Sequence, residues 1–278
     1  MRRLERAAGA ALGCAIGGMT LLGLVYTPYG ANEMNGAERF MPPCLAHPMG
    51  TDSFGRDVFS RVMIGGRYTL AVALFTITVS SAAGISLGMA AGYAGGIWDE
   101  LVVRLIDVLS SFPAVLLALT VVSRMGNGPD ALSTALVLLF IPGYTRIARN
   151  EVLRCKHADF TLNALVMGAS HRRILFVHLL PNMKPAFFSA VYVGLSNAII
   201  SESAMSYLGF GAQPPFPSWG RMLSESQGML FNAPWCALAP GTVIVLTVLS
   251  IRPTCALSFS ILRQIRRRTA RRYPPAKD

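Results

Sequence analysis

Charged residues are scarce in this sequence. They make up 14% of its 278 residues, whereas soluble domains average about 25%. Hydrophobic residues account for 53% and the mean hydropathy is +0.47, so too few charged side chains remain to give a body of this size a solvated surface. This composition excludes an ordinary soluble domain and an intrinsically disordered chain. It predicts a protein that is solvated largely by lipid.

Several motifs of redox, metal and nucleotide chemistry are missing as well. The five cysteines stand at positions 14, 44, 155, 236 and 255 with no C-x-x-C spacing, which argues against a zinc site or a disulfide framework. No G-x-x-x-x-G-K-[S/T] loop for a nucleotide and no H-E-x-x-H zinc pattern occurs. The four histidines stand singly, at positions 47, 157, 171 and 178. We therefore expect no metal site, no cofactor and no enzyme activity in this chain.

Six mostly apolar runs are candidates for membrane crossing, because about 20 such residues span the hydrocarbon core of a bilayer as a helix. We expect these helices at about residues 7–26, 68–92, 104–123, 131–146, 186–209 and 228–251. A cleaved signal peptide is the alternative for the first run, but no convincing small-x-small cleavage site follows it. The predicted fold class is all-α, a polytopic membrane protein with about six transmembrane helices.

The third and fourth runs are the weakest of the six. Arg104 and Asp107 lie in the first turn of the third run, where their i,i+3 spacing places them on one helix face and lets them partly neutralise each other. The fourth run is short, so we expect Arg146 at its end to extend its charged group to the membrane surface. The second run is the longest and is rich in small residues, which allow helices to approach closely.

The basic residues predict the orientation of the chain. The net charge is +11. With the N-terminus inside and six crossings, 19 of the 25 Lys and Arg residues fall in inner segments and 6 in outer ones. This enrichment on the inner side is the positive-inside rule. The basic charge is therefore explained by topology with a cytoplasmic N-terminus, and a nucleic-acid partner is not needed.

Three strings of sequence are similar to a known family. They are His47–Arg61 (HPMGTDSFGRDVFSR), Arg172–Asn182 (RRILFVHLLPN, preceded by Gly168-Ala-Ser) and Glu202–Gly220 (ESAMSYLGFGAQPPFPSWG). In this order they resemble the inner-membrane permease subunits of bacterial binding-protein-dependent ABC importers. The branch is that of the second permease of dipeptide, oligopeptide and nickel systems, and Asp107–Leu119 resembles it too. The resemblance covers about residues 45–250.

The segment 146–185 between the fourth and fifth runs is long for a connection in a helical bundle, and such loops tend to be functional. From Asp159 its residues predict a helix that is interrupted at Gly168-Ala-Ser. Gly168 permits a left-handed turn. Ser170 is a suitable cap for a second helix, which we expect Pro181 to end. A basic loop that only sets topology is the alternative.

In the family, this segment is the coupling motif that docks into a groove on the ATPase subunit. The resemblance implies the same role for these residues: Asp159, Ala164, Gly168, Ala169, Ser170, His178, Leu180 and Pro181. One part departs from the family pattern, because the usual Ala-Ala-Arg ahead of the glycine is Asn163-Ala164-Leu165 in this chain. The departure concerns the strength of docking and leaves the identity of the motif unchanged.

Three acidic residues on the predicted outer side invite functional interpretations. Asp52 and Asp57 suit a metal site or an acid–base pair, but we interpret their turn-rich string as structural, with Asp52 as a cap for the segment that follows it. Glu202 lies in the fifth run, where an ionisable residue is a functional candidate. It either faces the transport pathway or bonds Ser201 or Ser203. Trp219 follows a proline-rich stretch and suits an interfacial anchor.

The resemblance implies a subunit that forms half of a translocation pathway by alternating access in the bacterial inner membrane. Its expected partners are a homologous permease subunit, two cytoplasmic ATP-binding subunits that hydrolyse ATP, and a periplasmic solute-binding protein. Short peptides are the expected substrate, and nickel or a metal chelate is the alternative within the same architecture. An alternative from another class is a membrane scaffold, or a remnant, without transport activity.

The C-terminal segment departs from the family. Six arginines lie between residues 263 and 272, where the family has a Gly-Asp-Leu-Arg-Asp-like end. Our hypothesis is that a frame change replaced the original tail; a short basic tail on anionic lipid is the alternative. We divide the chain into an N-terminal helix and outer segment (1–67), a permease core (68–251) that includes the loop 146–185, and a basic cytoplasmic tail (252–278).

Overall fold

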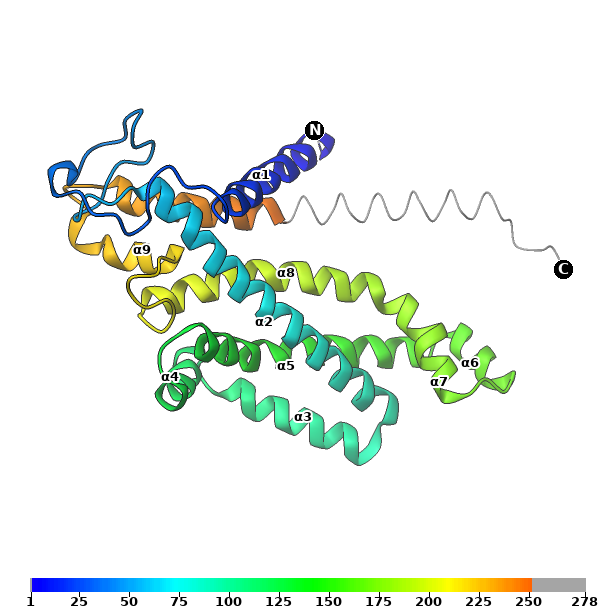
Figure 1. Cartoon of the computed structure of the whole chain (residues 1–278). Helices are drawn as coiled ribbons and strands as arrows, with labels where there is room; N and C mark the ends of the chain where they lie inside the picture. The colour runs from blue at the N-terminus through cyan, green and yellow to red at the C-terminus, as the bar shows by residue number, and fades with distance from the viewer. Residues whose placement is uncertain (1, 252–278) are drawn as a thin grey trace.

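The computed structural model describes residues 2–251, and these residues form helices joined by turns and loops (Figure 1). In chain order the helices are α1 (Arg2–Leu22), α2 (Val58–Ala94), α3 (Gly96–Ser111), α4 (Ala114–Met125), α5 (Pro129–Lys156), α6 (Asp159–Val166), α7 (His171–Arg173), the π-helix η2 (Ile174–Leu179), α8 (Leu180–Tyr207), α9 (Trp219–Glu225) and a last helix, Trp235–Ile251. Two 3₁₀ turns, η1 (Gly36–Glu38) and η3 (Gln227–Met229), lie in the loops. No strand occurs within 2–251, which confirms the all-α prediction.

An apolar helix lies at each of the six predicted runs. In the part of the chain that the structure describes, three helical stretches are long and apolar enough to cross a membrane: α2, α5 and the continuous stretch His171–Tyr207. The pair α3 and α4 adds a fourth span if the two are taken together, with a bend of 90° between them. The break falls at Phe112, which is extended (φ −79°, ψ 130°) because the proline that follows disfavours the helical conformation. Ala7–Leu22 and Trp235–Ile251 are shorter apolar helices.

Two details of the weaker runs were predicted wrongly. The fourth helix is not short, since α5 has 28 residues and continues ten residues beyond Arg146. Arg104 and Asp107 do not pair: Arg104 bonds Glu100 at 2.5 Å, and Asp107 accepts from Arg146 on α5 at 2.8 Å. Each residue thus pairs with an opposite charge elsewhere, on its own helix for Arg104 and on α5 for Asp107. The division at residue 67 stays a prediction, and the tail with its frame-change hypothesis lies outside the described residues.

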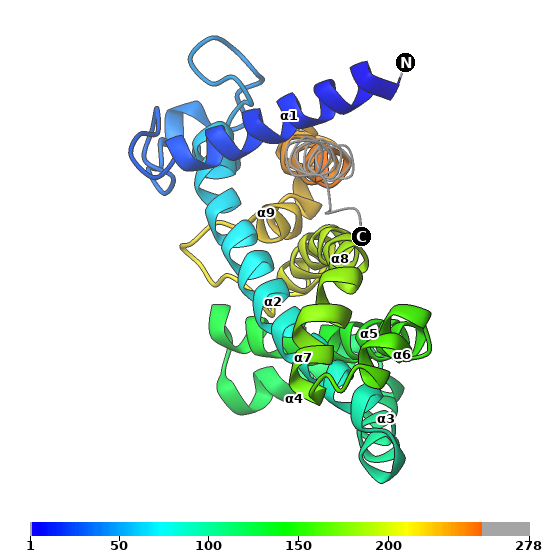
Figure 2. The ribbon, with the colours of Figure 1, turned by 90° about the vertical axis from the view of Figure 1, so that its right-hand side faces the viewer.

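Helix α2 crosses α5 and α8 diagonally and joins the two ends of the molecule (Figures 1 and 2). Gly84, Gly88 and Gly92 lie one turn apart on α2, against α5. A Cβ at Gly84 would lie 2.6 Å from the Cβ of Tyr144, and one at Gly88 would meet the Thr145 carbonyl oxygen. Small residues at this spacing let two helix backbones approach closely in a membrane. The prediction of close packing by the second run is confirmed.

We expect Gly88→Ala to destabilise the subunit by about 1–3 kcal/mol, because the added methyl group overfills a contact between two backbones. Gly143→Ala is the matched control, since a Cβ at Gly143 on α5 meets nothing within 4 Å and alanine favours the helix by about 0.5–1 kcal/mol. Thermal unfolding of the purified subunit in detergent measures both changes. Equal melting temperatures for the two variants would contradict the prediction.

Gly84-Ile-Ser-Leu-Gly88 also matches the G-x-S-x-G spacing of a serine nucleophile. That motif requires a sharp turn between a strand and a helix, which lifts the serine out of the backbone. Here the five residues lie within the continuous helix α2. The match therefore has no catalytic geometry.

Candidate functional site

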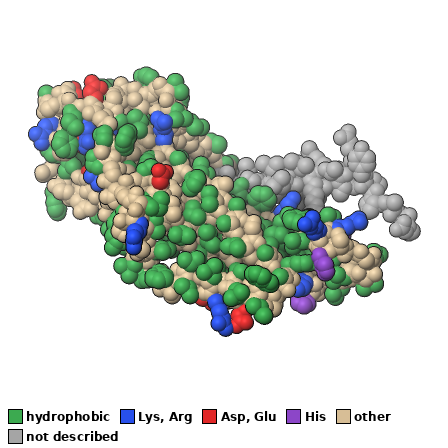
Figure 3. Space-filling model, turned by 60° about the horizontal axis from the view of Figure 1, so that its bottom comes forward, with side chains coloured by type: hydrophobic (Ala, Val, Ile, Leu, Met, Phe, Trp, Pro, Cys, Tyr) green, Lys and Arg blue, Asp and Glu red, His purple; other side chains and the backbone are tan. Residues whose placement is uncertain are grey.

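The predicted coupling segment forms a hairpin at one end of the bundle. Helix α6, α7 and η2 lie there, at the right of Figure 1, beyond the main body of α5 and α8. The loops around residues 27–57 and helix α9 lie at the opposite end. In Figure 3, histidines and several basic side chains gather towards the hairpin end, while hydrophobic side chains cover much of the face between.

The turn of the hairpin is built on Gly168, as predicted. Its φ is +77°, the left-handed conformation that glycine adopts without steric cost. The amide of Ala169 donates to the Ala164 carbonyl at 3.0 Å, and the amide of Gly168 donates to the Leu165 carbonyl at 3.0 Å. These two bonds form a Schellman motif, which satisfies the last carbonyls of α6 and reverses the chain.

We expect Gly168→Val to loosen this turn and Gly168→Asn to preserve it. Valine at positive φ costs about 1–2 kcal/mol, whereas asparagine tolerates the left-handed region. Hydrogen exchange of the α6 amides should accelerate about tenfold in the valine variant, following the local loss of stability. Unchanged exchange in Gly168→Val would mean that the glycine conformation does not hold the hairpin.

The second half of the hairpin begins as predicted and then differs. Ser170 caps α7, because its hydroxyl accepts from the Arg173 amide at 3.4 Å. Pro181, however, does not end the helix; it lies in the first turn of α8, which continues to Tyr207. The π-helical segment η2 precedes it and bonds Leu180 to the Leu175 carbonyl. The wider π-helical turn ends just before Pro181, which has no N–H to donate to the backbone. Proline is tolerated in the first turn of a helix, so α8 can continue through it.

The hairpin is anchored by an apolar core. Ile174, Leu179 and Met183 are fully buried and pack in one cluster with residues of α2 and α5, among them Met89 and Val152. Ala164 on α6 is buried, and the Thr161 hydroxyl donates to the Cys155 carbonyl at 2.8 Å. Interiors packed in this way transmit displacement. The hairpin and the ends of α2, α5 and α8 therefore share one packed core.

Polar contacts tie the base of the hairpin to α2. The Tyr93 hydroxyl, at the end of α2, lies 2.8 Å from Nδ1 of His171. Lys156 donates to the Tyr93 carbonyl at 2.9 Å. Near this point Arg149 on α5 donates two bonds to Asp99 on α3, at 2.5 and 2.6 Å. Bidentate pairs of this kind hold one geometry, so the contacts fix the directions of the helix ends below the hairpin.

The tip of the hairpin is apolar and exposed. Val166 and Met167 are 89% and 88% exposed, and Leu162 and Leu165 are about half exposed. Ser170 and Gly168 are exposed beside them. An exposed apolar patch on a rigid support marks an interaction site. Sequence reasoning missed Val166 and Met167, although an apolar pair directly before a turn glycine is a usable signal.

The other predicted coupling residues are spread over both arms of the hairpin. Asp159 and Pro181 are exposed, whereas Ala169, His178 and Leu180 are half-buried. The His178 carbonyl accepts from Asn182 at 2.7 Å. Within residues 2–251, no group of three or more His, Cys, Asp or Glu side chains is placed to hold a metal ion.

At the opposite end, Asp57 rather than Asp52 caps the second predicted helix. The Asp57 carboxylate accepts from the Ser60 amide at 2.7 Å and contacts Nδ1 of His47 at 2.9 Å. Asp52 instead stabilises its own turn, accepting from the amides of Phe54 and Arg56 at 2.8 and 3.0 Å. Asp52 thus caps the segment that directly follows it, as predicted, and the N-cap of α2 itself is Asp57.

Glu202 lies on α8 inside the helix packing and is 0% exposed. Its carboxyl group accepts from the hydroxyl of Ser206 at 2.6 Å and from that of Ser203 at 3.5 Å. Both hydroxyls belong to α8 itself. In this conformation Glu202 is therefore enclosed and hydrogen-bonded within its own helix. Trp219, predicted as an interfacial anchor, is also completely buried, with its Nε1 donating to the Val62 carbonyl at 2.9 Å.

Comparisons with known proteins identify the family of the chain. Residues 84–271 match the family described as the binding-protein-dependent transport system inner membrane component. The dipeptide transport system permease protein DppC of Alkalihalophilus pseudofirmus is 37% identical over 217 residues, which cover 78% of this chain and 71% of that protein. The glutathione transport system permease protein GsiD of Pectobacterium atrosepticum is 39% identical over 226 residues, which cover 80% and 74%.

A solved structure shares the fold. It is the methionine ABC transporter MetNI in inward-facing conformations, one chain of which aligns with a TM-score of 0.55 at 20% identity. The alignment covers 73% of this chain and 96% of that chain. The arrangement of the helices is therefore one that occurs in an ABC transporter.

Proposed function

Because the chain belongs to the family of inner membrane components of binding-protein-dependent transport systems, we propose that it forms half of the pathway by which an ATP-driven importer takes up short peptides. As a permease subunit it is a multi-pass protein of the inner membrane. Its N-terminus lies in the cytoplasm in this proposal, in keeping with the excess of Lys and Arg in the inner segments. ATP hydrolysis takes place in separate partner subunits.

The observation that carries the proposal is the hairpin formed by residues 159–181. It exposes an apolar tip on a buried anchor, which is what a docking element needs if it is to transmit force to the helices behind it. The residues proposed to couple to the ATPase are Asp159, Ala164, Gly168, Ala169, Ser170, His178, Leu180 and Pro181, together with the exposed pair at the tip. A homologous permease and a periplasmic solute-binding protein complete the proposed assembly.

The proposed mechanism is alternating access driven through this hairpin. Closure of the ATPase subunits displaces the tip, and the packed core moves the ends of α2, α5 and α8 with it. Helix α8 is continuous with the hairpin through η2, so a displacement at one end reaches the other. Glu202 enters the pathway in this proposal only when α8 separates from α2.

Short peptides are favoured as the substrate because the relatives are named for a dipeptide and for glutathione, a tripeptide. Uptake of labelled dialanine, labelled glutathione and labelled nickel, in cells lacking the gene and in cells with the gene restored, tests this directly. We expect uptake of a peptide to fall and recover. Recovery of nickel uptake alone would mean that the substrate is nickel and not a peptide. No change in the uptake of any of the three compounds would favour a scaffold without transport activity.

A further inference from the structure

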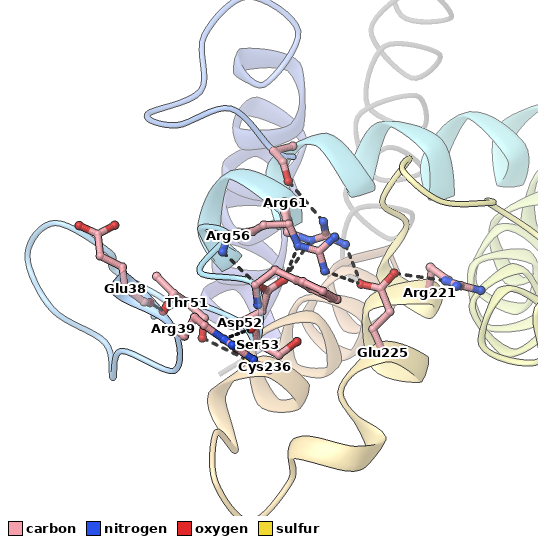
Figure 4. A network of polar contacts seen from close by, with 12 residues as sticks. Glu38, Arg39, Thr51, Asp52, Ser53, Arg56, Arg61, Arg221, Glu225 and Cys236 are labelled. Carbon is pink, nitrogen blue, oxygen red and sulfur yellow. Dashed lines mark hydrogen bonds and ion pairs between the residues drawn. The ribbon is translucent and has the colours of Figure 1, made fainter. Parts of the chain in front are cut away.

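Three arginines converge on one carboxylate at the end of the bundle opposite to the hairpin (Figure 4). One oxygen of Glu225 accepts from Arg61 at 2.8 Å and from Arg56 at 3.1 Å. Its other oxygen accepts from Nε of Arg221 at 3.3 Å. A single side chain at the end of α9 thus joins three cations from two parts of the sequence.

The cluster contains few other negative charges that could replace the Glu225 carboxylate. Among residues 2–251, Asp52 is the only other acid in it, 2.6 Å from Arg56 and 4.0 Å from Arg61. The side chains of Arg61 and Arg56 are 2% and 8% exposed, whereas Glu225 is 25% exposed. Removing one partner from a buried ion pair is strongly unfavourable because the remaining charge stays desolvated. The guanidinium groups of Arg56 and Arg61 therefore require either the Glu225 carboxylate or water as a hydrogen-bond partner.

Helix α9 connects this cluster to α8. Arg61 lies in the first turn of α2, and Glu225 is the last residue of α9. At the other end of α9, buried Trp219 bonds α2 at Val62, and Gly220 lies so close to the Ser203 carbonyl of α8 that a Cβ would overlap it. α9 therefore bridges α8 and α2, and a displacement of α8 from the hairpin end acts on the contact between Glu225 and Arg61.

The contact is suited to opening and closing. A small cavity of about 20 Å³ lies beside it, lined in part by Arg61, Glu225, Met222 and Cys236, which is room for a water molecule next to the charges. When the charges separate into water they recover solvation, which a separated apolar contact does not. Breaking the ion pairs is therefore less costly when water enters than when the cluster stays dry.

We infer that Glu225 with Arg56, Arg61 and Arg221 forms an ionic latch that holds α9 against the start of α2 at rest and opens during each transport cycle. The latch rests on the proposed transport function and adds to it a specific contact that must break at the far end. Glu225 is a positioning residue in this inference, because it acts through α9 and not on the substrate.

Native Cys236 reports the state of the latch. It is 4% exposed and contacts the Thr51 carbonyl at 3.5 Å beside the cavity. In the assembled transporter, with the other four cysteines replaced by serine, we expect slow labelling by a membrane-impermeant maleimide at rest. During ATP turnover with dialanine and the binding protein, labelling should be about tenfold faster, a factor that corresponds to ~1.4 kcal/mol. Equal rates at rest and in turnover would overturn the latch.

Glu225→Gln provides the second test, since it keeps the shape and removes the charge. We expect Cys236 labelling at rest to rise about tenfold, and ATP hydrolysis without peptide to rise with it, because the resting contact is lost. Glu38→Gln is the matched control, an acid of the same end that is 40% exposed and faces His47 at 3.4 Å. Labelling in Glu225→Gln that equals the control overturns the inference.

The outcomes separate the latch from the proposed function. If Glu225→Gln does not assemble, the turnover dependence of Cys236 labelling with native Glu225 decides alone. If the transporter with native Glu225 takes up peptide and its Cys236 labelling is constant, the latch fails and the transport function stands. If that transporter neither hydrolyses ATP nor takes up peptide, the proposed function fails and the latch with it.

Discussion

Replacing Val166 and Met167 together by aspartate will abolish ATP-driven uptake while the subunit still inserts into the membrane. These two side chains are the most exposed apolar groups of the hairpin, at 89% and 88%, so their loss removes docking surface without opening the core. Two carboxylates at the centre of an apolar interface remain unpaired after binding, and such groups cost about 2–5 kcal/mol each in affinity. We expect the affinity for the ATPase subunits to fall by at least about 100-fold.

Co-purification with the ATPase subunits and ATP-dependent uptake into proteoliposomes measure this loss. Leu45→Asp is the matched control, because Leu45 is also a fully exposed apolar residue but lies in the loop at the opposite end of the bundle. Full ATPase binding by the double aspartate variant would contradict the docking role of the tip. Loss of binding in Leu45→Asp as well would indicate a general effect of surface charge.

Trp219→Ala will be the most destabilising single substitution at the end of the bundle opposite to the hairpin. The indole is 0% exposed, packs in one apolar cluster with Val58, Val62 and Met222, and donates to the Val62 carbonyl. Truncating a buried tryptophan costs about 3–5 kcal/mol through lost burial and the cavity that remains. We expect a large fall in the melting temperature in detergent and in the amount of subunit in the membrane.

Two further variants separate the contributions of Trp219. Trp219→Phe keeps most of the apolar area and loses the hydrogen bond, so about 1 kcal/mol is expected. Trp98→Ala is the control, since Trp98 is 71% exposed and its removal leaves the packing intact. A melting temperature for Trp219→Ala close to that of Trp98→Ala would contradict the anchoring of α9 on α2.

The two regions act at opposite ends of the same helices. In the proposed cycle, the hairpin tip and its core pass a displacement to α2, α5 and α8, and the Trp219 contact makes α9 follow at the far end. Glu202 lies between them on α8, where its carboxyl group accepts from the Ser206 hydroxyl. In the proposed cycle, these contacts must exchange partners or separate as the two ends move.

Local features of this protein were determined by the sequence alone. The apolar runs predicted the helices because 20 or so residues without charge have few other stable conformations in a lipid phase. Gly168 predicted the turn and Ser170 the cap, since a left-handed residue and a hydroxyl at an N-terminus act on neighbours within a few positions. The family resemblance, which depends on contiguous strings, was confirmed for the same reason.

Only the tertiary structure decided which distant groups meet. Asp107 bonds Arg146, 39 residues along the chain, instead of Arg104 on its own helix. Arg56 meets Glu225 across 169 residues. The path through Pro181 was also decided by packing, because the buried Ile174 and Leu179 hold the π-helical turn on α2 and α5. Partners so far apart in sequence leave no periodic signal, and the energies that select them arise only when the helices pack together.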